Sequence, residues 1–196
     1  MKTGASGDPE VAALLEAIRS GQADASALYR QLYDELHGLA RVQRARWQGN
    51  WTMNTTALVH EAYVKLVGKK DFESRAHVLA TASRAMRQVL VSYAEARSAQ
   101  KRGGNAHDLP LDEAVAQLLT DDQADDVLAL NDALAKLAEA DERAARIVEC
   151  RYFGGLSVIE TAEALEVSEA TVTRGWRAAR AWLYGELKDD RLMSDT

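Results

Sequence analysis

The sequence predicts an all-α protein with two helical domains joined by an acidic linker. Apolar residues recur at helical spacing along most of the chain, no segment alternates as a strand would, and only two of the 196 residues are proline. The segment Arg102-Gly103-Gly104-Asn105 interrupts the helical pattern and precedes an acidic stretch. We therefore expect a first domain over residues 8–102, a linker over 103–124 and a second domain over 125–188.

Four helices are expected in the first domain, over residues 9–21, 24–47, 55–68 and 74–99. The first of them follows Asp8-Pro9, where an aspartate can cap the helix and proline takes its first position. Ser74 is placed to cap the fourth helix. Each helix carries an apolar stripe, which in the fourth comprises Val78, Leu79, Ala82, Met86, Val89, Leu90 and Tyr93.

The second domain is expected to contain helices over residues 125–139 and 141–153, followed by a helix-turn-helix. Ser157 is a good N-cap for the first helix of this motif, and Glu160 at the third helical position completes a capping box. Apolar residues then recur at helical spacing, namely Ile159, Ala162 and Leu165.

The second helix of the motif has its own start signal. Ser168 can cap it, and Val167 and Val172 flank the cap as a hydrophobic staple. The turn before it holds Glu166 where glycine is usual. The small Ala162 lets the two helices cross closely, a geometry that presents the second helix to a major groove.

Arginines on this second helix predict contact with duplex DNA. Arg174, Arg177 and Arg180 recur at three-residue spacing, so they share a face that can meet phosphates or base edges. Gly175 inside the same helix is expected to cost about 1 kcal/mol relative to alanine. The side chains expected to pack inward are Trp176, Ala179 and Leu183.

Charge is segregated along the chain, although the net charge is −6. Residues 75–102 carry a local charge of +5, and residues 105–142 carry −10. A separate basic block suits a nucleic-acid partner despite the acidic total. The single cysteine, Cys150, suits a buried position in a cytoplasmic protein, and no segment is apolar enough to span a membrane.

Neither catalysis nor a metal or cofactor is expected. His60-Glu61 begins like a zinc-protease helix, but the position of the second ligand holds Val64. The other histidines are scattered singly, at His37, His77 and His107. The chain also lacks a cysteine pair and a glycine-rich phosphate loop, so we do not expect an enzyme.

The C-terminal motif RYFGGLS…ETAEAL…VS…TVTR.WR.ARAWL is similar to the promoter-reading fourth domain of the extracytoplasmic-function (ECF) sigma factors of bacterial RNA polymerase. The segment TTALVHEAYVKLV, followed by RAHVLATASRAMRQVLVSYAEARSAQKRGG, resembles the second domain of one subgroup. The resemblance covers nearly the whole chain. It implies an alternative sigma factor that binds core RNA polymerase, directs it to promoters and helps to melt the DNA.

The resemblance also implies three sets of contact residues. The upstream promoter element would be contacted by Ser168, Glu169, Ala170, Thr171, Thr173, Arg174, Arg177 and Arg180. The start-proximal element, with a flipped base, would be contacted by Phe72, Glu73, Ser74, Arg75, His77, Arg84, Arg87, Arg97, Lys101 and Arg102. The clamp helices of the polymerase β′ subunit would be contacted by His60, Glu61, Val64 and Lys65.

The chain departs from the wider family at the start of the third helix, where acidic residues are usual. Here the positions hold Asn54, Thr55 and Thr56. A Ser/Thr kinase that phosphorylates Thr55 or Thr56 would supply the missing negative charge at a helix N-terminus, whereas plain capping is the simpler role for both. Control by an anti-sigma protein also stays open.

Two other functions compete with this interpretation. One is a conventional helix-turn-helix transcriptional regulator, although the N-terminal half lacks the alternating strands of a receiver domain. The other is a sigma mimic that binds polymerase or a sigma antagonist without reading DNA. The arginine row argues against the mimic, whereas Glu166 in the turn leaves this alternative open.

Overall fold

The computed structural model describes residues 9–46, 53–66, 72–101 and 121–194, and every regular element in these ranges is helical, as the sequence predicts. The N-terminal group contains α1 (Pro9–Arg19), α2 (Ala25–Arg46), α3 (Met53–Leu66) and α4 (Arg75–Lys101). The C-terminal group contains α5 (Asp121–Ala140), α6 (Glu142–Val148), the π-helical turn η1 (Glu149–Phe153), α7 (Val158–Leu165) and α8 (Glu169–Ser194).

Helices α4 and α6 begin where a side chain accepts one of the first free backbone N–H groups. The Ser74 hydroxyl accepts a hydrogen bond from the His77 N–H at 3.1 Å, and the Asp141 carboxylate accepts one from the Ala144 N–H at 2.9 Å. Helix α5 begins at Asp121, earlier than the expected start at residue 125. Acidic residues are favourable in a first turn because they face the positive end of the helix dipole, so this start is physically reasonable.

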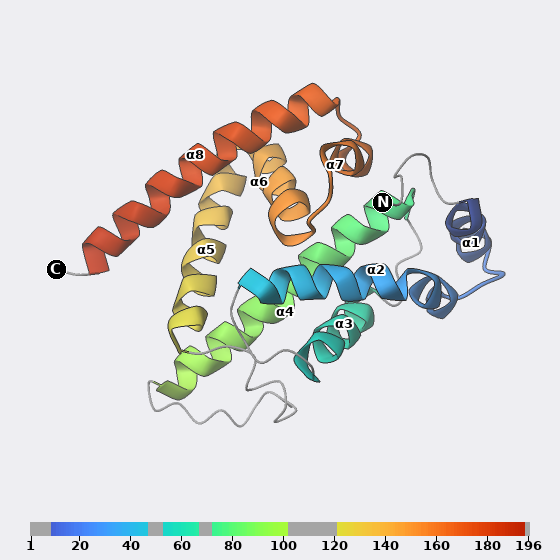
Figure 1. Ribbon diagram of the computed structural model, residues 1–196, viewed down its shortest axis with the longest axis horizontal. Helices are drawn as coiled ribbons and strands as arrows, with labels where there is room; N and C mark the ends of the chain where they lie inside the picture. Colours follow the sequence, from blue (N-terminus) through green and yellow to red (C-terminus); the bar gives the residue numbers. More distant parts are fainter. Residues whose placement is uncertain (1–8, 47–52, 67–71, 102–120, 195–196) are drawn as a thin grey trace.

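Helix α4 is the centre of the molecule (Figure 1). It packs against α2 and α3 on one side and against α5, η1 and α7 on the other, while α8 lies along the outside of the C-terminal group. The core of the N-terminal helices continues into the C-terminal group through Ala124, Val127, Cys150, Leu156 and Ala164. The two groups therefore share a hydrophobic core, which the sequence analysis did not predict. None of the described helices is both long and apolar enough to cross a membrane.

The end of the helix expected over residues 141–153 is a π-helical turn. The Gly154 N–H donates to the carbonyl oxygen of Glu149 at 3.0 Å, and the Leu156 N–H donates to that of Cys150 at 3.0 Å. The wider turn carries the chain from α6 to α7 while it keeps Cys150 and Leu156 in the core.

Gly175 is explained by a close approach within the C-terminal group. A Cβ at this position would lie 2.6 Å from Cδ1 of Ile147, whose side chain is 1% exposed. We expect Gly175→Ala to lower the free energy of unfolding by about 1 kcal/mol, because overpacking outweighs the gain in helix propensity. Ile147→Val removes the obstructing methyl group, so in that background the same alanine is expected to be neutral or stabilising. Urea unfolding of the four proteins of this cycle measures the coupling, and strictly additive effects would contradict the clash.

Candidate nucleic-acid interface

The turn between α7 and α8 is built as the sequence predicts. The Ser157 hydroxyl accepts from the Glu160 N–H at 3.1 Å, and the Ser157 N–H donates to the Glu160 carboxylate at 2.8 Å, which completes the capping box. Glu166 adopts a left-handed conformation with φ of 53°. The Ser168 hydroxyl then accepts from the Thr171 N–H at 3.2 Å and caps α8.

A small apolar cluster packs against the turn between α7 and α8. It contains Ile147, Ala162 and Val172, with Val167 packed against it, so the staple residues meet as expected. The inward side of α7 differs from the expectation in one place, because Ile159 is 58% exposed. Thr161 and Ala164 are buried on this helix, and the apolar spacing at Ile159 did not indicate them.

The start of α8 faces solvent. The exposed residues here are Ser168, Glu169, Ala170, Thr173, Arg174, Arg177 and Arg180, whereas Thr171 is half-buried. Ala179 and Leu183 are buried on the opposite side, as predicted, and Trp176 is half-buried. The Arg180 guanidinium lies over the Trp176 ring, 5.8 Å from its centre. The arginine face is therefore open to a ligand.

The predicted start-proximal set begins at the first turn of α4, where Glu73 is exposed and Phe72, Ser74, Arg75 and His77 are buried or half-buried. Phe72 is 3% exposed and belongs to the core of the N-terminal helices, with its ring edge-on to His77 at 5.9 Å. Ser74 is used as the helix cap. Glu73 is exposed, and its N–H donates to Nδ1 of His77 at 3.4 Å.

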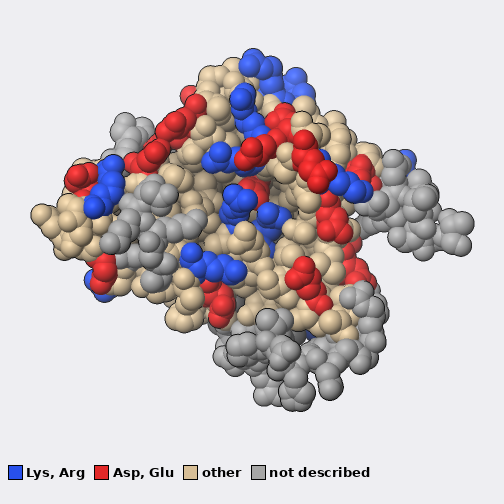
Figure 2. Space-filling model, turned by 180° about the vertical axis from the view of Figure 1, so that it is seen from behind, with Lys and Arg blue, Asp and Glu red and all other residues tan. Residues whose placement is uncertain are grey.

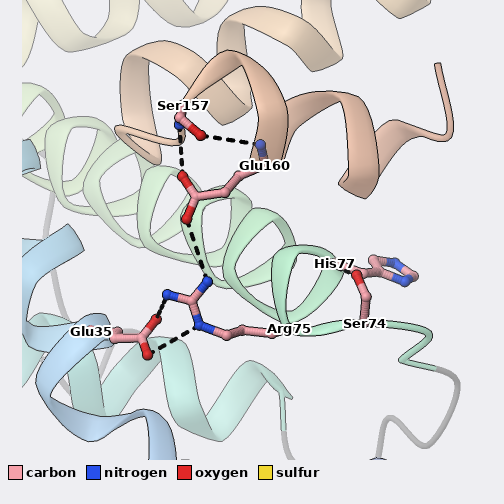
Figure 3. A network of polar contacts seen from close by, with 6 residues as sticks. All are labelled: Glu35, Ser74, Arg75, His77, Ser157 and Glu160. Carbon is pink, nitrogen blue, oxygen red and sulfur yellow. Dashed lines mark hydrogen bonds and ion pairs between the residues drawn. The ribbon is translucent and has the colours of Figure 1, made fainter. Parts of the chain in front are cut away.

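Arg75 connects three helices (Figure 3). Its guanidinium forms a two-point ion pair with Glu35 of α2, with one N–H···O distance of 3.2 Å, and reaches Glu160 of α7 at 3.4 Å. The Glu160 carboxylate thus accepts from both Arg75 and the Ser157 N–H. A single side chain ties the first turn of α7 to the first turn of α4.

Arg87 makes the corresponding connection in the middle of α4. Its guanidinium donates to the Glu149 carboxylate at 2.7 Å and to the Asn131 side-chain oxygen at 2.7 Å. Only 14% of the Arg87 side chain and 13% of the Glu149 side chain are exposed. Arg84 lies 3.9 Å from the same carboxylate and is more exposed. Glu149 therefore faces two arginines of the predicted DNA-contacting helix.

The remaining members of this set are spread along α4. Arg97 is half-buried, Lys101 ends the helix, and Arg102 lies outside the described residues. On the face opposite that of Figure 1, basic side chains gather at a central hollow and acidic side chains flank them (Figure 2).

The surface predicted to meet the polymerase lies on α3. His60, Val64 and Lys65 are exposed and Glu61 is half-buried, while Leu58, Val59, Ala62 and Leu66 form the buried stripe. Val64 is 55% exposed, so an apolar side chain lies among polar ones. The two threonines at the start of this helix differ, because Thr55 is 2% exposed and Thr56 faces solvent.

A comparison with families of known proteins identifies the family of the chain. The model of the family of ECF sigma factors matches residues 8–189. The chain belongs to the ECF sigma factor family. No curated protein and no solved structure matched the chain. ECF sigma factors are transcription initiation factors rather than enzymes, and they bind core RNA polymerase and promoter DNA.

Two carboxyl groups of this ECF sigma factor have shifted pKa values where the helical groups meet. The pKa of Glu166 is raised by its hydrogen bond with the Glu73 carboxyl group and by the negative charge of that group. Partial burial raises the pKa of Glu160, but hydrogen bonds from Ser157 and the pairing with Arg75 outweigh burial and leave it below its usual value.

The lowered pKa of Glu160 predicts a pH dependence of stability. Because the folded state favours the ionised carboxylate, its contribution is present above the usual carboxyl pKa of about 4.5 and is lost as the pH falls through the folded-state pKa. We expect Glu160→Gln, which keeps a capping side chain, to reduce stability by about 0.5 kcal/mol near pH 7, a size typical of partly exposed pairs. Urea unfolding of both proteins at several pH values tests this. A difference that persists unchanged at pH of about 3 would refute it.

Cys150 is 2% exposed, as the sequence predicts for a buried cysteine. Burial raises the pKa of its thiol to about 12, so the group is neutral and unreactive in this conformation. Sequence reasoning did not identify Glu35, Asn131 and Glu149 as partners of the predicted DNA-contacting arginines. No local signal points to them, because each lies in a different helix from the arginine that it contacts.

Proposed function

We propose that this ECF sigma factor recognises the upstream promoter element with the first turns of α8 and contacts the start-proximal element with the beginning of α4. The main support is the exposed row of Ser168, Thr173, Arg174 and Arg177 on a helix whose other side is fixed in a core. Short polar side chains allow base edges to approach, and the arginines complement phosphates.

At the start-proximal element, α4 would contribute the arginines. Arg75, Arg84 and Arg87 lie along the helix, each close to a carboxylate. DNA phosphates could take the place of these carboxylates as partners of the guanidinium groups. Phe72 would stack on a flipped base only after leaving its buried position, so its role requires a local rearrangement.

Helix α3 would dock on the clamp helices of the polymerase β′ subunit through His60, Glu61, Val64 and Lys65. The exposed Val64 gives this polar surface an apolar centre, which is the usual composition of a contact between proteins. Replacement of Val64 by aspartate would weaken binding to core RNA polymerase without touching the DNA-contacting helices.

Run-off transcription tests the proposed function. The assay contains core RNA polymerase, this chain and genomic promoter fragments, and transcripts that depend on the chain would establish a promoter-specificity subunit. Binding to polymerase without transcripts or DNA binding would favour a sigma mimic. DNA binding without any effect on core polymerase would favour a conventional regulator.

Phosphorylation at the start of α3 is a further part of the proposal. Of the two threonines, Thr56 is the accessible one, and it lies in the first turn of α3, where a phosphate is electrostatically favoured. Thr56→Glu would then strengthen the complex with core polymerase relative to Thr56→Ala. Full-strength binding by the unphosphorylated chain would exclude this switch.

A further inference from the structure

Helices α5 and α8 enclose a wide groove on the C-terminal group. The two helices diverge towards the end of α8 (Figure 1), and the groove between them has a volume of about 1470 Å³. Its floor is apolar, because it is lined by Leu130, Val148 and Leu183, which belong to the core of this group. Neither the DNA contacts nor the clamp contacts proposed above use this floor.

Tyr184 is the feature of this groove that the fold does not explain. Its side chain is 73% exposed, although it lies beside the apolar floor. Trp176 and Leu187, which also line the groove, are only half-buried. A contiguous exposed apolar surface usually marks a contact with another protein, and tyrosine and tryptophan side chains contribute most to such contacts. The groove therefore has the composition of a protein interface.

The two sides of the groove carry opposite charges. On the α5 side lie Asp125 and Asp126, and on the α8 side lie Arg177, Arg180 and Lys188. All five residues are exposed. A protein that fills the groove must therefore present an apolar centre with basic groups on one side and acidic groups on the other.

The same face of a second copy of the chain meets this requirement. A two-fold rotation about an axis along the groove places α8 of each copy opposite α5 of the other, so the basic side of one groove meets the acidic side of the other. The same rotation brings the two Tyr184 side chains between the apolar floors, in the hollow that the helices leave. Contacts of this self-complementary kind are the commonest in homo-oligomers.

We propose that the free chain forms a two-fold dimer through the groove between α5 and α8, with Tyr184 of each copy inserted between the two floors. Arg177 and Arg180 line the groove, so the dimer covers arginines that the proposed function assigns to promoter DNA. That consequence rests on the proposed function, whereas the dimer itself does not. This face of α8 then binds either a second copy or the promoter, but not both at once.

Sedimentation equilibrium of the full chain tests the dimer. We expect the mean mass to rise from 21.5 kDa towards twice that value between about 1 and 100 µM chain. Tyr184→Ser removes the aromatic ring from the groove and is expected to weaken the dimer roughly tenfold. Tyr33→Ser is the matched control, because Tyr33 is an exposed tyrosine of α2, outside the groove, and this variant is expected to dimerise like wild type. A mass of 21.5 kDa at every concentration, or equal association by the two variants, would overturn the proposal.

Charge reversal tests the two-fold arrangement. Asp125→Lys with Asp126→Lys makes both sides of the groove basic. Arg180→Glu with Lys188→Glu gives both sides a net negative charge. Each double variant alone is expected to be monomeric, because like charges then face each other, whereas an equimolar mixture is expected to form a 1:1 complex. Circular dichroism first checks that both are folded, and Tyr184→Ser decides if either is not. A mixture of folded variants that stays monomeric would overturn this arrangement.

DNA binding separates the dimer from the function on which its consequence rests. At chain concentrations where wild type is dimeric, Tyr184→Ser is expected to reach half-saturation of a labelled duplex at a lower concentration than Tyr33→Ser. Equal DNA binding by these variants would refute the covering of the arginines. A dimeric wild type with no DNA binding by any form would leave the dimer standing and refute the proposed function. If the chain is monomeric throughout and Tyr184→Ser weakens its complex with core RNA polymerase, the groove belongs to the polymerase and the proposal is overturned.

Discussion

Replacement of Gly154 by alanine is expected to lower the free energy of unfolding by about 3 kcal/mol. A Cβ at this position would lie 2.5 Å from the carbonyl oxygen of Cys150 and 2.6 Å from the hydroxyl oxygen of Ser83. Neither atom can move easily. The carbonyl oxygen accepts from the Leu156 N–H at 3.0 Å, and Ser83 is fully buried and donates to the Leu79 carbonyl oxygen at 2.7 Å.

The corresponding shift in Tm is about 6–12 °C for a chain of this size, which calorimetry or circular dichroism can measure. Gly185→Ala is the matched control, because Gly185 is exposed on α8 and a Cβ there would meet nothing within 4 Å. That variant is expected to gain up to about 1 kcal/mol in helix propensity. Similar changes in Tm for the two variants would show that the turn around Gly154 relaxes, contrary to the prediction.

Local capping signals located the starts of α4, α7 and α8. Ser74, Ser157 and Ser168 each accept the hydrogen bond that the sequence predicts, because a cap depends only on residues within one turn. The apolar stripe of α4 was also predicted, since a helix of regular period must bury the same face throughout. The buried side of the short helix α7 was harder to predict, because Ile159 has the expected helical spacing but is exposed.

Contacts between the two helical groups could not be predicted from the sequence. Arg75 and Glu160 are 85 positions apart, and Arg87 and Glu149 are 62 positions apart, so no periodic pattern relates them. The opposite charges of the blocks at 75–102 and 105–142 were visible, but charge segregation alone does not specify which arginine meets which acid. The same limit applies to Phe72, whose burial depends on the N-terminal helices packing around it.

Removal of Arg174 and removal of Arg177, at the start of α8, are expected to affect DNA binding in different ways. Arg177→Ala is expected to weaken holoenzyme binding to promoter and non-promoter DNA alike, because a phosphate contact carries no sequence information. The slope of log K against log salt concentration should fall by about 1, the value for one lost phosphate contact. Fluorescence anisotropy with labelled fragments between roughly 50 and 200 mM salt measures both quantities.

Arg174→Ala is expected instead to reduce the preference for the promoter by about 1–3 kcal/mol, because Arg174 is nearer the helix start, where base edges are reached. Transcription should become undetectable when both arginines are alanine, since specificity and attraction are lost together. Arg143→Ala, which removes an exposed arginine from α6, is the control and should transcribe like wild type. Unchanged promoter preference in Arg174→Ala would place the base contacts elsewhere on α8. Unchanged transcription by the double variant would mean that this face of α8 does not bind the promoter.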